Sequence, residues 1–241
     1  MKYILISGAT SGIGFETAKL FAEKGYNLAI CGGKNQENLN KVLEELSVFQ
    51  VQVLSYLGDI KNPEFVREMM NDIFSHFPHL DAVINNAGVS HVGLLTDMSV
   101  EELEHVIGVN LSALFYVCRL AIPSMTRRKK GRIINISSIW GDSGASCEVA
   151  YSASKGGVNS FTKALAKELA PSGIQVNAIS FGAIQTRMND NLSNEEKNAF
   201  EEKIPVGRYG TPKEAAMLIE QLLHTPDYLT GQIIRMDGGF L

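Results

Sequence analysis

The chain of 241 residues predicts an α/β fold, with a doubly wound, mostly parallel sheet of seven strands flanked by helices on both faces. Short runs of β-branched and apolar residues alternate with longer segments of helical periodicity along most of the sequence, and parallel strands need such crossover segments between them. No linker rich in proline, glycine or serine divides the chain. Residues 1–241 are therefore expected to form a single domain.

The expected elements follow one another in a regular order. The strands are expected at 3–7, 27–31, 52–56, 82–85, 132–137, 175–179 and 232–236. The helices are expected at 12–24, 36–47, 63–76, 100–127, 150–170 and 212–223. The first helix, for example, carries Ile13, Thr17 and Phe21 on one side. Residues 182–210, rich in Asn, Glu and Gly, interrupt the alternation after the sixth strand, and we expect them to form a substrate lid.

The composition excludes several classes of protein. Hydrophobic residues make up 45% and charged residues 20%, and the mean hydropathy is +0.01, as in ordinary globular chains. The formal net charge of −4 disfavours broad attraction to nucleic acid or to an anionic membrane. Three cysteines without a CxxC pair suit a reducing compartment, and no run approaches the roughly 18 apolar residues of a membrane span. The sequence predicts a cytoplasmic protein.

A glycine cluster lies where the first strand meets the first helix. Gly8, Gly12 and Gly14 fall within Ser-Gly-Ala-Thr-Ser-Gly-Ile-Gly at 7–14. Without Cβ atoms these positions allow a tight turn and bring backbone N–H groups close to a pyrophosphate at the helix N-terminus. An ordinary strand-to-helix turn is the alternative. The place between the first strand and the first helix favours a Rossmann-type dinucleotide site, and no Lys-Ser or Lys-Thr follows to suggest a nucleoside triphosphate loop.

A second group of polar residues belongs to the same predicted edge of the sheet. Tyr151 and Lys155 are one helical turn apart, so the phenol and the ammonium share a face. Taken alone, the pair would be interpreted as a surface contact. Ser138, however, ends the fifth strand, and ligands of open α/β sheets bind at the carboxyl ends of the strands. The glycine cluster, Ser138 and Tyr151 are expected to meet there.

These residues together resemble the short-chain dehydrogenase/reductase family, in its compact single-domain branch. The resemblance covers essentially the whole chain and rests on motifs that occur in the family's order. They are the loop at 7–14, Asp59-Ile60, Asn85-Asn86-Ala87-Gly88, Asn110, Ser138, Tyr151-x-x-x-Lys155, and Gly182 to Thr186.

The resemblance implies a set of site residues. The catalytic residues would be Asn110, Ser138, Tyr151 and Lys155. The cofactor would be bound by Gly8, Thr10, Ser11, Gly12, Ile13, Gly14, Lys34, Asp59, Ile60, Asn86, Ala87, Gly88, Tyr151, Lys155, Gly182, Ile184 and Thr186.

The implied chemistry is hydride transfer to a ketone. Tyr151 would donate the proton, with its pKa lowered from about 10 by Lys155 and the oxidised nicotinamide. Ser138 would donate a hydrogen bond to the substrate oxygen, Lys155 would hold the ribose, and Asn110 would position a water.

The choice of nicotinamide cofactor depends on the end of the second strand. An acidic residue there favours NAD, and a basic residue favours NADP. Cys31-Gly32-Gly33-Lys34-Asn35 has no acidic residue, so Lys34 favours NADP(H) over NAD(H). Alternatively, Lys34 is a solvated turn residue and Asn35 caps the next helix.

Phe181 departs from the family pattern, because relatives usually have proline there. Its ring is expected either to lie near the cofactor or the substrate pocket, or to face outward with little effect.

The carbonyl substrate is less well specified. Segments 204–214 and 230–239 resemble the branch that reduces 3-oxoacyl groups on acyl carrier protein, which makes that reaction and that partner the leading hypothesis. Residues 138–148 resemble a sister group that reduces a ketone on a modified lysine of elongation factor P, and Trp140 and Glu148 would select that substrate. A reductase of another small ketone, and a dinucleotide-binding redox sensor without catalysis, remain as alternatives.

Three further expectations concern the surface. His76 and His79 have metal-like spacing, but they straddle a proline and no metal site is predicted. The basic run 127–130 either complements the dipole at a helix C-terminus or docks an acidic partner such as acyl carrier protein. The family resemblance also implies a homotetramer built by the helices near 100–127 and 150–170 and by the last strand.

Overall fold

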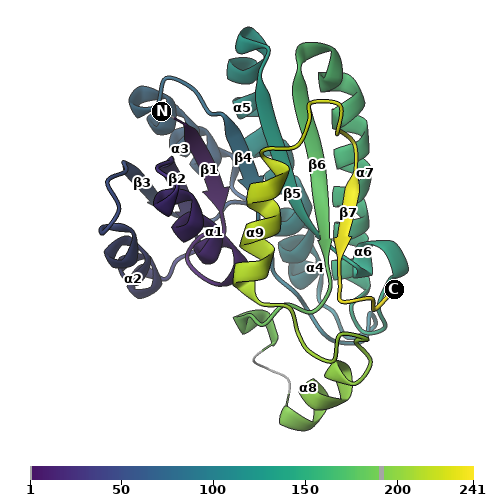
Figure 1. Ribbon diagram of the computed structural model, residues 1–241. Helices are drawn as coiled ribbons and strands as arrows, with labels where there is room; N and C mark the ends of the chain where they lie inside the picture. Colours follow the sequence, from purple (N-terminus) through teal and green to yellow (C-terminus); the bar gives the residue numbers. More distant parts are fainter. Residues whose placement is uncertain (1, 190–192) are drawn as a thin grey trace.

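One parallel sheet organises the molecule (Figure 1). A computed structural model describes residues 2–189 and 193–241. The strands are β1 (Tyr3–Ser7), β2 (Asn27–Gly32), β3 (Val53–Leu57), β4 (Ala82–Asn85), β5 (Gly131–Ser138), β6 (Ile174–Phe181) and β7 (Ile233–Met236). They lie in the order β3-β2-β1-β4-β5-β6-β7, and every neighbouring pair is parallel. The predicted doubly wound α/β fold is confirmed.

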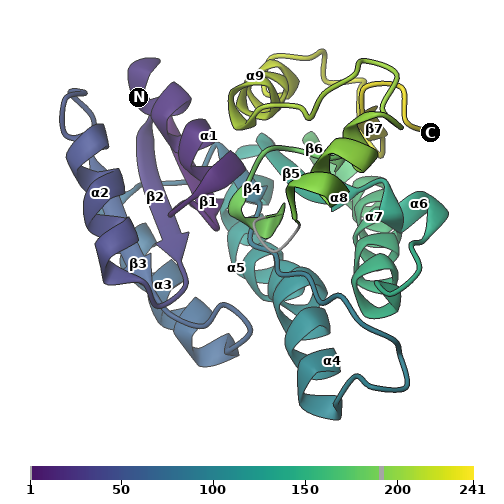
Figure 2. The ribbon, with the colours of Figure 1, turned by 90° about the horizontal axis from the view of Figure 1, so that it is seen from below.

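Helices cover both faces of the sheet (Figure 2). They are α1 (Gly12–Glu23), α2 (Gln36–Leu46), α3 (Pro63–His76), α4 (Val100–Ile107), α5 (Ala113–Arg128), α6 (Trp140–Ser143), α7 (Val149–Leu169), α8 (Asn194–Glu201) and α9 (Pro212–Leu222). Buried residues of α1, α2 and α9 pack on one face, and those of α3, α5 and α7 pack on the other.

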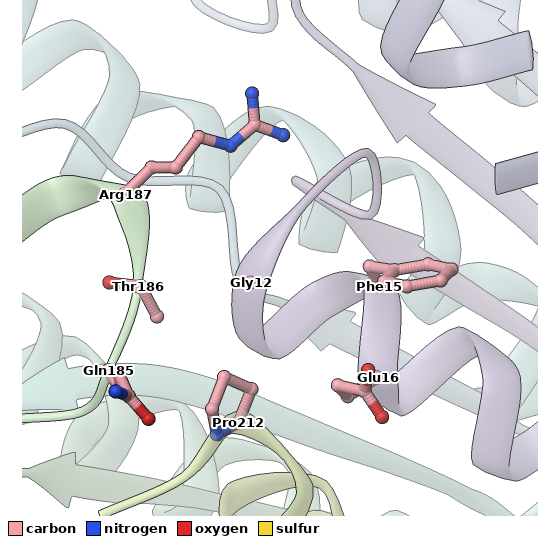
Figure 3. Close-up of a pocket in the computed structure, with 7 residues that line it drawn as sticks. All are labelled: Gly12, Phe15, Glu16, Gln185, Thr186, Arg187 and Pro212. Atoms are coloured by element: carbon pink, nitrogen blue, oxygen red, sulfur yellow. The ribbon is translucent and has the colours of Figure 1, made fainter. Parts of the chain in front are cut away.

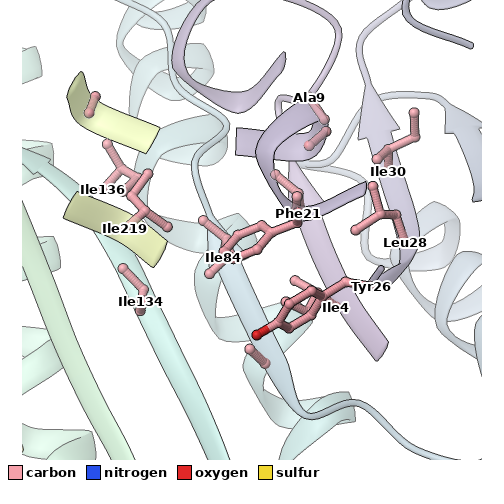
Figure 4. Close-up of a cluster of buried hydrophobic side chains, with 14 of the residues drawn as sticks. Ile4, Ala9, Phe21, Tyr26, Leu28, Ile30, Ile84, Ile134, Ile136 and Ile219 are labelled. Carbon is pink, nitrogen blue, oxygen red and sulfur yellow. The ribbon is translucent and has the colours of Figure 1, made fainter. Parts of the chain in front are cut away.

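The strands supply both cores because successive side chains point to opposite faces. Ile4 and Ile6 of β1 belong to the cluster under α1 and α9, whereas Leu5 between them belongs to the cluster under α3 and α5. Figure 4 shows the first cluster, which joins Phe21 of α1 to Ile4, Leu28 and Ile84 of three strands. Burial on both faces explains why the strands are continuous apolar runs rather than alternating ones.

The long helix predicted at 100–127 is divided in the structure. A π-helical turn, Gly108–Ser112, separates α4 from α5, and Asn110 lies in it with no exposed surface. π-turns leave an extra residue in the helix and often occur at functional sites. From this turn the Asn110 side-chain amide reaches the backbone of Val89 and the hydroxyl of Ser154.

The same helix meets the criterion for a membrane span by length and composition over residues 100–128, contrary to the expectation that no run of the chain does so. Val109, Val117 and Ala121 of this helix lie in the core cluster between α3 and the sheet. Core helices of folded domains also meet this criterion of length and composition. Because its apolar residues are buried in the core cluster, we assign this helix to the core. A cytoplasmic location remains a prediction.

Two short helices were not predicted. One is α6, which directly follows β5, and the other is α8, within the predicted lid. A capping box between Ser193 and Glu196 begins α8. The lid segment is closed at its base by a bridge between Ile184 and Gly210, and its residues 190–192 lie outside the described chain.

Candidate active site

The glycine loop joins β1 to α1 and leaves no room for a Cβ at Gly8 or Gly14. Gly8 and Gly12 have φ of +66° and +55°, a conformation that favours glycine. A Cβ on Gly14 would overlap the carbonyl oxygen of Gly8. The Asn86 amide donates to the carbonyls of Ser7 and Gly8, at 3.0 Å each, and so fixes the loop against the end of β4. The sequence motif thus forms a rigid backbone cradle.

The N-terminus of α1 fits an anionic group. Its N-cap, Ser11, makes no side-chain capping bond, and no acidic residue lies in the first turn. The N–H groups at Gly12, Ile13 and Gly14 are consequently free of a capping side chain, at the positive end of the helix dipole. This backbone fits the pyrophosphate of a dinucleotide, as the sequence predicts.

The residues expected around the adenosine lie at the ends of β2 and β3. Thr10 packs against Gly32, where a Cβ would overlap its methyl group. Ile60 is buried, and the Asp59 carboxylate accepts the N–H of Lys61 at 3.1 Å. Lys34 is exposed, and Asn35 caps α2 by accepting the N–H of Asn38 at 2.9 Å. The structure places Lys34 at this edge of the sheet, just beyond the end of β2.

The four residues expected to be catalytic come from three elements. Asn110, Ser138, Tyr151 and Lys155 are 0%, 6%, 8% and 4% exposed. Ser138 at the end of β5 forms a hydrogen bond with Tyr151 of α7. The Lys155 Nζ lies 5.7 Å from the centroid of the Tyr151 ring and donates to the carbonyl of Ile136 at 2.9 Å. The structure brings the serine, the phenol and the ammonium together.

Asn110 and Gly88 complete this arrangement. The Asn110 amide donates to the Val89 carbonyl at 2.9 Å and to the Ser154 hydroxyl at 3.0 Å, and its oxygen accepts the Val89 N–H at 2.8 Å. A Cβ on Gly88 would lie 3.4 Å from Lys155 Nζ and 3.5 Å from Asn110 Oδ1. A side chain at position 88 would therefore be in van der Waals contact with both the lysine and the asparagine.

A buried chain of amides holds α7 in place behind these residues. Asn85 of β4 donates to Asn135 of β5 at 2.8 Å, and Asn135 donates to the Thr162 hydroxyl of α7 at 2.9 Å. Because unpaired buried amides are costly, these bonds fix the position of α7 relative to the sheet. The position of Tyr151 follows from that of its helix.

In the protein without its cofactor, burial opposes the lowering of the Tyr151 pKa that Lys155 and the oxidised nicotinamide are expected to produce. Burial raises the pKa of Tyr151 to about 12, the hydrogen bond with Ser138 acts in the opposite direction, and the Glu148 carboxylate adds to the rise. Burial also lowers the pKa of Lys155 to about 8. Desolvation of both groups therefore outweighs the attraction of the ammonium for a phenolate. At neutral pH the phenol keeps its proton, which suits a proton donor.

Phe181 occupies neither of the positions expected for it. Its side chain is 4% exposed and belongs to the core cluster that faces α1 and α9. The alternation along β6 turns this ring into the core, whereas Gly182 follows at the strand end and packs against Asp237. Phe181 is a packing residue.

A cavity of about 360 Å³ opens between the glycine loop and the lid segment (Figure 3). Its walls are Gly12, Phe15, Glu16, Gln185, Thr186, Arg187 and Pro212. The Thr186 methyl would lie 3.2 Å from a Cβ on Gly12, so the segment after β6 closely approaches the start of α1. Thr186 was predicted at the cofactor, but Arg187 was not, although it is the next residue in the sequence.

Four aromatic rings gather between α6, the segment after β6 and the C-terminus. Phe200 of α8 stacks on Phe240 near the C-terminus, with centroids 5.2 Å apart, and Trp140 lies edge-on to Phe240 at 5.7 Å. Tyr209 is 5.9 Å from Phe200. Because Trp140 follows Ser138 by two residues, this cluster connects the lid helix and the C-terminus to the catalytic edge. Sequence periodicity does not reveal such long-range contacts.

Comparison with known proteins decides the family. Residues 2–197 match the family of short chain dehydrogenases. The chain belongs to the short-chain dehydrogenase family. Membership makes this protein an oxidoreductase that uses a nicotinamide dinucleotide.

Individual members of the short-chain dehydrogenase family resemble the chain over its full length. An uncharacterized oxidoreductase, YmfI, of Bacillus subtilis is 38% identical over 99% of this chain and 98% of its own. The 3-oxoacyl-[acyl-carrier-protein] reductase FabG of Thermotoga maritima is 36% identical over 100% and 98%. The crystal structure of a variant of actinorhodin polyketide ketoreductase with NADPH has a TM-score of 0.93 and 31% identity, over 99% of this chain and 97% of that one.

Proposed function

We propose that the protein is an NADPH-preferring ketone reductase whose substrate is a 3-oxoacyl group on acyl carrier protein. The observation that carries the proposal is the buried Ser138–Tyr151 hydrogen bond beside Lys155, at the sheet edge that also holds the glycine loop. Full-length relatives named as 3-oxoacyl-[acyl-carrier-protein] reductases support the substrate class.

The chemistry supplied by a bound nicotinamide is hydride transfer to the carbonyl carbon. Tyr151 donates its phenolic proton to the carbonyl oxygen as negative charge develops there, so that a ketone becomes an alcohol. Ser138 donates a hydrogen bond to the same oxygen. Lys155 holds the ribose and stabilises the phenolate left after transfer, and Asn110 holds a water that returns the proton.

The central test is the rate of NADPH oxidation with an acetoacetyl carrier thioester. We expect Tyr151→Phe to reduce turnover about 10²- to 10⁴-fold while dinucleotide binding persists. Tyr228→Phe is the matched control, because Tyr228 is 100% exposed. Wild-type turnover in Tyr151→Phe would contradict the proposed mechanism, and oxidation of neither NADPH nor NADH with any ketone would favour a dinucleotide-binding sensor.

The NADPH preference rests on Lys34 beyond the end of β2, together with the absence of an acidic residue between Cys31 and Asn35. We expect Lys34→Gln to raise the KM for NADPH and to leave the KM for NADH unchanged. Equal changes for both cofactors would mean that Lys34 is only a solvated turn residue.

The basic run at the end of α5 supports docking of an acidic carrier. Arg128 is engaged by Asp81 at 2.6 Å, so Arg127, Lys129 and Lys130 are the cations left for a partner. Reversing the charge of Lys129 and Lys130 is expected to raise the KM for the carrier thioester but not for a small ketone.

A second candidate substrate, the ketone on a modified lysine of elongation factor P, is favoured by Glu148. This partly buried carboxylate lies one turn before Tyr151 and has no ion-pair partner among the described residues. A carboxylate at this place attracts an amine. Faster reduction of the ketone-bearing factor than of the carrier thioester would select this substrate, and Glu148→Gln should then reduce that rate alone.

We also propose a homotetramer, as the family resemblance implies. Phe115 of α5 is 51% exposed although it packs edge-on against Phe161 of α7, with centroids 4.6 Å apart. An apolar ring pair at the surface of two adjacent helices is typical of an interface between copies. Sedimentation of a monomer at micromolar concentration would contradict this proposal.

A further inference from the structure

Arg187 is an arginine that lines the cavity between the glycine loop and the segment after β6. It directly follows Thr186 and begins a single turn of 3-10 helix, Arg187–Asn189. Its exposed side chain makes no ion pair or hydrogen bond with any residue that the structure describes. Other arginines do have carboxylate partners, namely Arg67, Arg128, Arg132, Arg208 and Arg235.

The surroundings of Arg187 select for an anion. Arg187 and Gly12 line the same cavity, and the positive end of the α1 dipole begins at Gly12 (Figure 3). Glu16 also lines this cavity, yet Arg187 does not pair with it. A flexible cation next to uncapped N–H groups is favourable only when negative charge enters between them.

The chain that carries Arg187 is held in place. Gln185 donates its N–H to the Gly210 carbonyl at 2.8 Å, and Gly210 donates its N–H to the Ala183 carbonyl at 2.9 Å. The contact between the Thr186 methyl and Gly12 brings this segment against the start of α1. The base of Arg187 is therefore fixed before a ligand binds, which reduces the entropy lost on binding.

We propose that Arg187 binds the pyrophosphate of the dinucleotide cofactor, adding a charged side-chain contact to the backbone N–H groups of the glycine loop. The inference rests on the proposed function, because it takes a nicotinamide dinucleotide as the ligand. The planar guanidinium presents paired N–H donors that match two phosphate oxygens, and it adds a full positive charge that the backbone N–H groups of the glycine loop lack. The segment after β6 thus binds the cofactor through charge as well as through Thr186.

The test is calorimetric titration of Arg187→Gln with ligands that carry or lack the pyrophosphate. We expect the Kd for NADPH and for 2′-phospho-ADP-ribose to rise about ten- to a hundredfold, the loss typical of a charge-assisted hydrogen bond. The Kd for adenosine 2′-monophosphate, which has no pyrophosphate, should stay within about twofold. Arg187→Lys should bind NADPH more tightly than Arg187→Gln does, because lysine keeps the positive charge but lacks the paired N–H donors of the guanidinium.

Arg67→Gln is the matched control, because it removes the same charge from the exposed surface of α3. An unchanged Kd for NADPH in Arg187→Gln would overturn the inference alone. An equal rise in the Kd for all three ligands would also overturn the inference, because adenosine 2′-monophosphate has no pyrophosphate for Arg187 to bind. Failure of the unmodified protein to bind any nicotinamide dinucleotide would overturn the proposed function together with the inference.

Discussion

The edge of the sheet that carries the glycine loop, Ser138 and Tyr151, and the segment between β6 and α9, are built in opposite ways. The edge consists of buried side chains and of glycines with no space for a Cβ, such as Gly14. The segment is mostly exposed and is held by backbone bonds at Gly210 and by aromatic contacts of Phe200. We infer from this difference that substitutions in the glycine loop or around Tyr151 disturb the fold, whereas the segment between β6 and α9 can change in sequence without loss of the fold.

The largest effect should follow from filling the glycine loop. Gly14→Ala places a methyl group against the Gly8 carbonyl and the Asn86 amide, and we expect the free energy of unfolding to fall by about 3 kcal/mol. Urea denaturation measures this change. Gly33→Ala is the control, since a Cβ there meets nothing within 4 Å. A Gly14→Ala protein as stable as the control would mean that the glycine loop can shift to accommodate a methyl group. The loop would then not be more rigid than the segment between β6 and α9.

The buried ammonium gives a pH-dependent effect of similar size. Because burial lowers the pKa of Lys155 from 10.5 to about 8, the unfolded state binds more protons than the folded state between these pH values, and stability rises with pH. Relative to Lys155→Met, the unmodified protein should gain about 3 kcal/mol of unfolding free energy across this window.

Thermal or urea unfolding at several pH values measures the difference. A difference that does not change with pH would mean that Lys155 is already solvated.

The smallest effect should come from the aromatic cluster. Phe240→Ala removes one ring from contact with Phe200 and Trp140, and we expect a loss of about 1 kcal/mol in stability. Trp140 is the sole tryptophan of the chain, so its fluorescence reports this site directly. The KM for the ketone should rise while the Kd for the dinucleotide stays constant. Leu241→Ala, at a neighbouring exposed position, should change neither, and a raised dinucleotide Kd in Phe240→Ala would mean that the two regions are coupled.

Most of the fold was predictable because local signals and global packing agree. The apolar runs marked every strand to within about two residues, since both faces of this sheet are buried. The π-turn at Asn110 and the short helices α6 and α8 were not predicted, because they depend on a packed partner or on a single capping box. Motifs predicted the candidate site residues, whereas the role proposed for Arg187 has no motif and follows only from the approach of its segment to Gly12.

The sequence by itself determined the order of strands and helices, the place of the glycine loop and the one-turn spacing of Tyr151 and Lys155. These properties are local, because a glycine's freedom and a helical repeat are set by neighbouring residues. The tertiary structure decided what Phe181 packs against, in which direction burial shifts the pKa of Tyr151, and which cation lies beside the start of α1. Burial and charge at a point depend on every segment that meets there, and those segments are far apart in the sequence.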